Sequence, residues 1–195
     1  MKMPIVFGVV ALIVMTFGAN VLFSQDLDKK KKTAAFTLAG VEYFHRFSRD
    51  NLHEYTPAGQ DDLMAWQDMV TINIYPQAKD EATLAQTAEA VLNIYKENRA
   101  QILTKDYVPR LKDKPAEHLI VAGFGRPEFI EVTFARFKIH DSAGRAVIYS
   151  RRVYGKKNAD EMNAWLEKNG LATEKALMKW DEMPKLTVRN SIPGK

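Results

Sequence analysis

The chain has 195 residues, is 46% hydrophobic and shows no internal repeat, as expected of one ordinary domain with a tail. It contains no cysteine, which excludes a disulfide framework, a cysteine nucleophile, a thiolate metal site and a lipoprotein anchor. Five of the 28 basic and two of the 24 acidic residues lie in the first 32 positions, so the remainder is nearly neutral and nucleic-acid binding is not expected.

Residues 1–24 are predicted to be a signal peptide or a membrane anchor, because Met3 to Gln25 carries no charge. A signal cleaved after Ser24 predicts a periplasmic or secreted protein. An uncleaved helix predicts a protein anchored to the inner membrane through Met3 to Phe23, since the run is long enough to span a bilayer. Two observations support the uncleaved anchor as an alternative: the poor Ala-x-Ala match before the cleavage site and the lysines at 29–32, which favour the cytoplasmic side.

Residues 25–40 are predicted to be a lysine-rich linker, with a contact to anionic lipid as the alternative. A single α+β domain is predicted over residues 41–181, followed by a loose tail over 182–195. The elements expected in its first half are a hairpin of Val41–Phe47 and Leu52–Tyr55, a strand Met69–Tyr75, an amphipathic helix Asp80–Glu97 with Asp80 as N-cap, and a short strand Ile102–Val108.

Residues 117–154 are predicted to form three consecutive antiparallel strands, His118–Phe124, Phe129–Ile139 and Arg145–Val153. Pairing Ile139 with Arg145 across an Asp-Ser-Ala-Gly turn leaves both faces of this meander largely apolar, so helices should cover both sides of the sheet. In this register, one face carries Ala135, Phe137, Ile139, Val147, Tyr149 and Val153, and the other carries Ile130, Val132, Phe134, Ala146 and Ile148.

The C-terminal part is predicted to be helical from Asn158, which forms a capping-box pattern with Glu161. Asn169-Gly170 is a typical helix stop, so 171–180 is expected to be a second helix or a kinked continuation.

Candidate catalytic and metal-binding residues are few. His45 and His53 can approach across the first hairpin, but no metal-ligand spacing accompanies them, so no metal is predicted. Gly123-Phe124-Gly125 leads into a strand and is interpreted as a turn rather than a phosphate loop. No nucleophile motif is present, and the acidic pairs sit at helix starts. The sequence therefore predicts neither a catalytic residue nor a cofactor.

Basic residues gather on the last strand, its exit and the strand beside it. Cross-strand ion pairs, with Arg151 diagonal to Glu131 and Glu128 near Lys156, are one interpretation. A patch for an anionic partner is the other, and its residues are Arg136, Lys138, Arg145, Arg151, Arg152, Lys156 and Lys157.

The element order from Val41 to Trp180 resembles the PsbP-like fold, an antiparallel sheet between helical layers. TPAGQDDLMAWQDMVTINIY and PAEHLIVAGFGRPEFIEVTFARFK are also similar to segments of small exported bacterial proteins of unknown function. The fold expected is α+β, with five to six antiparallel strands covered by helices on both faces. The PsbP-like resemblance implies a non-catalytic domain that binds or assists another protein, and no functional residue carries over from it.

The function expected is an exported or membrane-tethered binding or accessory module of the bacterial cell envelope, with a protein or small ligand as partner. The alternatives are a carrier of a small apolar ligand between sheet and helices, and an envelope hydrolase. A large apolar cavity under Trp165 and Trp180 would favour the carrier. A filled core with a surface groove would favour the partner module, and a cleft with a titration-shifted His or carboxylate would favour the hydrolase.

Overall fold

The computed structural model describes residues 33–112 and 114–186, which all belong to one compact unit. The expected signal or anchor segment, residues 25–32 of the expected linker and residues 187–195 of the tail lie outside the described residues. Neither helix within the described ranges is long and apolar enough to cross a membrane.

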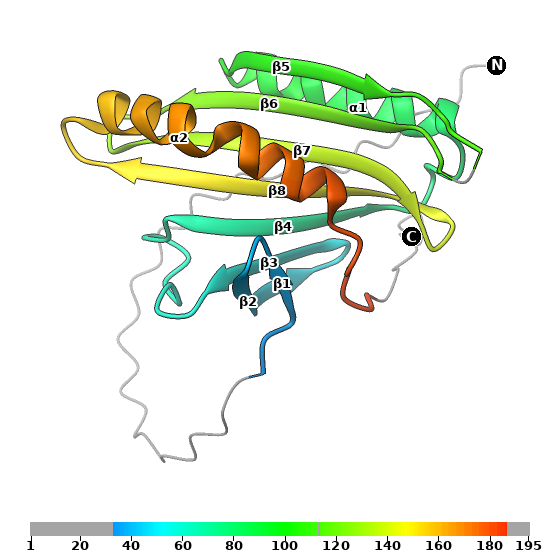
Figure 1. Cartoon of the computed structure of the whole chain (residues 1–195), viewed down its shortest axis with the longest axis horizontal. Coiled ribbons are helices and arrows are strands. Elements are labelled where there is room, and N and C mark those ends of the chain that lie inside the picture. The colour runs from blue at the N-terminus through cyan, green and yellow to red at the C-terminus, as the bar shows by residue number, and fades with distance from the viewer. Residues whose placement is uncertain (1–32, 113, 187–195) are drawn as a thin grey trace, which may run out of the picture. The chain divides into compact units, whose positions relative to one another are not determined.

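The domain is an α+β fold built on one antiparallel sheet (Figure 1). Its eight strands exceed the expected five to six and are ordered β1-β2-β3-β4-β8-β7-β6-β5. The strands are β1 (Phe36–Leu38), β2 (Val41–Arg49), β3 (Leu52–Pro57), β4 (Asp68–Tyr75), β5 (Gln101–Val108), β6 (Glu117–Gly125), β7 (Phe129–His140) and β8 (Ala143–Tyr154). The helices are α1 (Glu81–Glu97) and α2 (Asn158–Lys179).

The two helices cover opposite faces of the sheet, as the two-sided apolar pattern predicts. Helix α2 packs on β7 and β8, and α1 packs on β6 and β7 behind them (Figure 1). Met162 and Leu177 of α2 join the larger core cluster, whereas Leu84 and Leu92 of α1 join a separate cluster on the other face. The sheet is therefore the middle layer of three.

The register of the β7–β8 hairpin differs by one residue from the expected pairing. Ile139 lies opposite Gly144, and Lys138 lies opposite Arg145. The reason is a two-residue turn, since Asp141 and Ser142 both have positive φ, 50° and 60°, as a type I′ turn requires. Val132 and Phe134 therefore share the α2 face with Val147, Tyr149 and Val153, whereas Ala135 and Phe137 share the α1 face with Ala146.

The boundaries of both helices have local explanations. Asp80 caps α1, accepting a hydrogen bond from the Thr83 backbone N–H at 2.8 Å. Helix α2 is continuous through Gly170, so the expected stop is wrong, and the residues after it continue the same helix rather than form a second one. Packing of its residues against the core outweighs the roughly 1 kcal/mol that a mid-helix glycine costs. The expected capping box of Asn158 and Glu161 is also wrong, because Lys157 is the N-cap and no side chain makes a capping hydrogen bond.

The domain also extends beyond the expected boundaries at 41 and 181. Strand β1 lies within the stretch expected to be linker and pairs with β2. Met183 and Leu186, in the expected tail, pack against the larger core cluster. Their apolar side chains explain why this part of the tail joins the domain.

The two edges of the sheet are unlike each other. Strand β1 has three residues, and its Thr37 carbonyl accepts a hydrogen bond from the Trp180 indole at 2.8 Å. Strand β5 has eight residues and pairs with β6 along one side only. The long, mostly exposed edge is therefore β5.

Candidate functional site

Five of the seven basic side chains in the expected anionic-partner patch are buried or partly buried in the domain. Arg136, Lys138 and Arg145 are buried, and Arg151 and Arg152 are partly buried in ion pairs. Lys156 and Lys157 are exposed. The structure thus does not bring the seven together as one surface, and ion pairing, the other interpretation, accounts for most of them.

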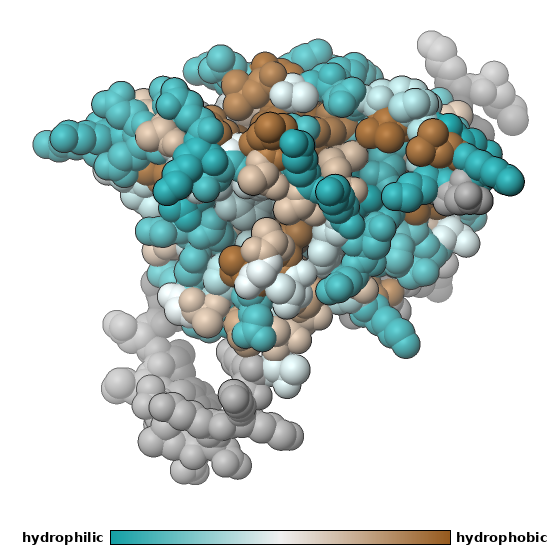
Figure 2. Space-filling view, in the orientation of Figure 1, coloured by the Kyte–Doolittle hydropathy of each residue, from teal (hydrophilic) through white to brown (hydrophobic). Residues whose placement is uncertain are grey.

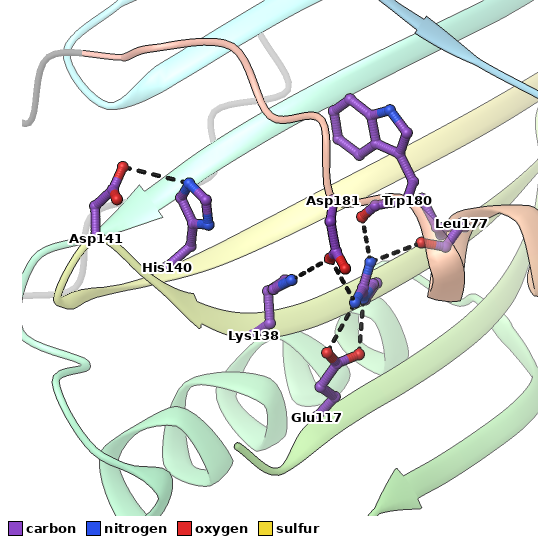
Figure 3. Close-up of polar contacts among 8 residues, drawn as sticks. Glu117, Lys138, His140, Asp141, Leu177, Trp180 and Asp181 are labelled. Carbon is purple, nitrogen blue, oxygen red and sulfur yellow. Dashed lines mark hydrogen bonds and ion pairs between the residues drawn. The ribbon is translucent and has the colours of Figure 1, made fainter. Parts of the chain in front are cut away.

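Arg136 is the centre of a buried polar cluster that attaches the end of α2 to the sheet, and Figure 3 labels its partners Glu117, Leu177 and Trp180. Its Nε and Nη2 donate to the two carboxylate oxygens of Glu117, each at 2.8 Å. Its Nη1 donates to the carbonyls of Leu177, at 2.9 Å, and Trp180, at 2.5 Å. Both carbonyls lie at the helix end. The Leu177 carbonyl also accepts the Trp180 backbone N–H at 3.2 Å, and Arg136 adds a donor to each carbonyl, so it acts as a cap supplied by the sheet.

Lys138 continues this cluster by donating to Asp181 (Figure 3). This hydrogen bond is the main cause that lowers the pKa of Asp181 below its ordinary value, with the nearby Lys138 and Arg136 charges adding to it. Asp181 follows α2 directly, so the segment leaving the helix is attached to β7 as well.

Arg151 and Arg152 form ion pairs, but the Glu131 expected to pair with Arg151 pairs with Arg152 instead. Arg151 donates to Asp68 on β4 at 2.7 Å, and Arg152 donates to Glu131 on β7 at 2.7 Å. The Arg152 guanidinium also lies over the rings of Trp66 and Phe129, at 3.9 and 4.2 Å from their centroids. Both arginines therefore have structural partners.

Arg145 is the exception among these arginines. Its side chain is 1% exposed, and its Nη2 donates to Asp141 at 3.0 Å. Its Nε and Nη1 are buried without a hydrogen-bond acceptor among the described residues. Burial consequently lowers the pKa of Arg145, with Asp141 opposing that effect. A buried guanidinium with two unpaired nitrogens is costly for the fold.

The β5 edge carries the densest set of exposed apolar side chains. Leu103, Tyr107 and Val108 of β5 and Leu111 just after it are between 37% and 60% exposed, and they make up half of the large hydrophobic side chains exposed in the described ranges. Figure 2 shows hydrophobic side chains along the upper edge of the molecule, where Figure 1 draws β5. The surface formed by these four residues is called the β5 edge below.

The β5 edge is held in place from the α1 side. Lys105 pairs with Glu89 at 2.7 Å, and Arg110 pairs with Glu81 at 2.5 Å. A bulge between Ile102 and Thr104 interrupts the pairing with β6. The part of β5 that pairs regularly with β6 and is held by an ion pair with α1 is therefore the stretch from Thr104 to Val108.

A groove of about 470 Å³ opens at the other end of the sheet order, between the β2–β3 hairpin and residues 184–186. It is lined by His45 and His53, which approach each other across the hairpin as the sequence allows and bond to the same hydroxyl. The Oγ of Ser48 lies 2.6 Å from His45 Nε2 and 2.7 Å from His53 Nδ1. We call these three residues the His-Ser-His chain.

A β-bulge assembles the His-Ser-His chain. In a regular strand His45 and Ser48 would point to opposite faces, because they are three residues apart. The register shift between His45 and Phe47 adds a residue and turns both side chains to the same face. Sequence patterns carry no clear signal for this bulge, which is why the role of Ser48 was not predicted.

The interior under α2 is filled. Trp165 packs against Phe134 and Tyr149, and Trp180 packs against Phe36. A pocket beside α2 measures about 150 Å³, which is about half the lower limit for ordinary ligand sites. This geometry gives the apolar-ligand carrier no support.

The histidines and carboxylates whose pKa is shifted do not gather in a cleft. Burial raises the pKa of Glu54 and lowers the pKa of His118 and His140, yet neither pocket described above is lined by any of them. Within the described ranges, no cluster of three or more His, Cys, Asp or Glu side chains is arranged to hold a metal ion.

Comparisons with known proteins identify no family. No protein-family model and no curated protein matches the chain. Among solved structures, it is similar to the Ran-binding protein Mog1p of Saccharomyces cerevisiae, with a TM-score of 0.43 and 10% identity over 70% of this chain and 82% of that chain. A likeness at this level concerns the arrangement of elements, and neither site residues nor partners carry over.

Proposed function

We propose that this protein is an accessory module that binds a protein partner through the β5 edge, with an extended partner segment pairing as a ninth strand. The observation that carries the proposal is the eight-residue edge strand with apolar side chains exposed along it. Unpaired strand edges are templates for pairing with another chain, and main-chain hydrogen bonds then supply affinity while side-chain pockets supply specificity.

The contrast between the two edges supports this choice. Strand β1 is short and in contact with Trp180, whereas β5 is long and carries few of the devices that normally protect an edge. The bulge before Thr104 is such a device and limits pairing to the part from Thr104 to Val108, and the Lys105 within that part is held by its ion pair with Glu89. The filled interior favours a surface interaction over an enclosed ligand.

The cellular location of the protein is proposed from the sequence alone. The uncharged run from Met3 to Gln25 supports an exported protein, either cleaved or tethered to the membrane. The mass of the protein purified from the envelope of its native cells tests this point. A mass that begins at Gln25 supports cleavage, the full-length mass supports the anchor, and recovery from the cytosol alone would refute export.

The β5 edge is tested by site-specific photo-crosslinking in native cells, with the crosslinker at Tyr107, which is 51% exposed, and a control at Leu171, a 63% exposed apolar residue on α2. We expect one defined adduct at Tyr107 and none at Leu171. The crosslinked segment, made as a peptide, should slow amide exchange at residues 104–108. Adding a charge with Tyr107→Glu should weaken binding about tenfold or more, and Leu171→Glu should not.

Three results would reject the proposal. They are equal crosslinking at both positions, a bound partner that leaves exchange at residues 104–108 unchanged, and an adduct consisting only of a second copy of this chain.

A further inference from the structure

A side chain of β5 occupies part of the backbone at the open side of this strand. The N–H of Tyr107 donates to Oδ1 of Asp106 at 2.7 Å. In an antiparallel ladder, residues bonded to the neighbouring strand alternate with residues whose N–H and C=O point away from it. A bond to a carboxylate of the same strand is typical of an N–H that points away. The Tyr107 N–H therefore lies where an added strand would pair.

The pairing between β5 and β6 agrees with this orientation. Tyr107 lies directly opposite His118 on β6, and the centroids of the two rings are 5.1 Å apart. Side chains approach each other most closely at pairs that are not hydrogen-bonded to each other, and at such pairs the backbone groups of an edge strand face outward. Asp106 thus covers a group that an added strand needs, and a partner has to displace its carboxylate.

The two faces of β5 carry different charges. Lys105 and Tyr107 lie on the α1 side, where Lys105 pairs with Glu89 at 2.7 Å. Asp106 lies on the α2 side, because it is opposite Leu119, a member of the core cluster under α2. Asp106 is exposed, and no lysine or arginine in the described part of the chain forms an ion pair with it. Its displacement from Tyr107 would therefore leave a carboxylate without a counter-charge on the α2 side.

The basic residues that follow β5 do not neutralise this carboxylate. Arg110 pairs with Glu81 on α1 at 2.5 Å. Lys112 and Lys114 come after the stretch that pairs regularly with β6. A strand added along residues 104–108 would therefore meet a negative charge on its α2 side, at Asp106.

We propose that Asp106 selects the partner of the β5 edge, favouring an extended segment with a lysine or arginine opposite Asp106 and an apolar side chain opposite Tyr107. This inference rests on the strand addition proposed above. Opposite charges directly across two paired strands are favourable, and like charges are unfavourable. A basic side chain attracts the carboxylate away from the Tyr107 N–H and neutralises it, whereas an acidic side chain repels it.

The test uses a phage-displayed library of random twelve-residue peptides, selected on the purified protein. The peptides that bind at the β5 edge are those that fail to bind Tyr107→Glu. We expect them to carry a lysine or arginine beside an apolar residue, and to bind about three- to tenfold more weakly when glutamate replaces that basic residue. Selection on Asp106→Lys should reverse the preference to acidic peptides. Glu167→Lys, which reverses an exposed charge on α2, should leave it unchanged.

Two further variants separate the charge of Asp106 from its hydrogen bond. Asp106→Asn keeps an oxygen that can accept the Tyr107 N–H, whereas Asp106→Ala does not. Both should bind the basic peptides and their glutamate versions about equally. Amide exchange at Tyr107 in the protein alone, corrected for the intrinsic rate of each sequence, should be about two- to tenfold faster in Asp106→Ala and little changed in Asp106→Asn.

The outcomes distinguish this inference from the function on which it rests. If peptides that depend on Tyr107 show no basic preference, or keep it with Asp106→Lys, the role of Asp106 is overturned and strand addition at β5 stands. Unchanged exchange in Asp106→Ala overturns the blocking hydrogen bond. If no peptide depends on Tyr107, or if the chain only forms a dimer that Tyr107→Glu abolishes, both proposals are overturned.

Discussion

Replacing Arg136 by methionine should be the most destabilising of the arginine substitutions in this sheet. The side chain is 3% exposed and donates to both oxygens of Glu117 and to two carbonyls at the end of α2. Methionine leaves a carboxylate that is only 10% exposed without its partner. Breaking a buried ion pair on one side costs about 3–5 kcal/mol of unfolding free energy.

The double variant Arg136→Met with Glu117→Leu separates the ion pair from the cap. Removing both charges avoids the unpaired carboxylate, and such replacements are often nearly neutral. The carbonyls of Leu177 and Trp180 still lose the Arg136 donor, although the Leu177 carbonyl keeps the Trp180 N–H. The double variant should therefore lose about 1–3 kcal/mol, less than the single one.

Equilibrium urea unfolding, followed by tryptophan fluorescence, measures these differences, with the exposed Lys156→Met as a matched control expected to change little. The reasoning is refuted if Arg136→Met costs less than about 1 kcal/mol, or if the double variant is no more stable than the single one.

Three further predictions use the same unfolding measurement. Gly144→Ala should cost about 1–3 kcal/mol, because the new Cβ would lie 2.6 Å from Ala78 Cβ, whereas Gly125→Ala meets nothing within 4 Å and should be near neutral; equal effects would contradict this packing. Arg145→Met should raise stability by about 1 kcal/mol, since it removes a buried charge with two unpaired nitrogens, and a loss like that of Arg136→Met would contradict the argument. The pKa of Asp181 is held below its ordinary value of 3.8, so the ionised side chain stabilises the fold above that pH, and this contribution is lost as the pH falls through the folded-state pKa. Asp181→Asn should therefore make the unfolding free energy depend less on pH below about 5. An unchanged dependence on pH would refute this prediction.

Features set by neighbouring residues were predictable from the sequence. The first hairpin, β4, α1 and the three-strand meander follow from apolar periodicity and from the Asp80 cap, which act within a few residues. The covering of both faces followed from the two-sided apolar pattern of β7 and β8. It survived an error of one residue in register because both faces are apolar, whichever residues lie on each.

Features that depend on distant partners were not predictable. Gly170 looks like a helix stop, but sheet packing on both sides of it keeps α2 continuous. The partner of Arg151 comes from β4, a strand far away in the chain, whereas the partner of Arg152 depends on the one-residue register of the β7–β8 hairpin. The approach of His45 and His53 was visible in the hairpin, whereas the bulge that brings Ser48 between them has no local pattern. The position of β5 at an edge depends on the strand order of the whole sheet.

The unequal edges of the sheet also limit the stoichiometry of any assembly made by strand addition. Fibrous growth needs two complementary ends, so that each added subunit offers a fresh template for the next one. Here the three-residue β1, with its Thr37 carbonyl bonded to Trp180, is a poor template, and β5 is a good one. A partner segment that pairs with β5 therefore occupies the one edge that is a good template. We expect the sheet to accept one added strand and not to assemble into a filament.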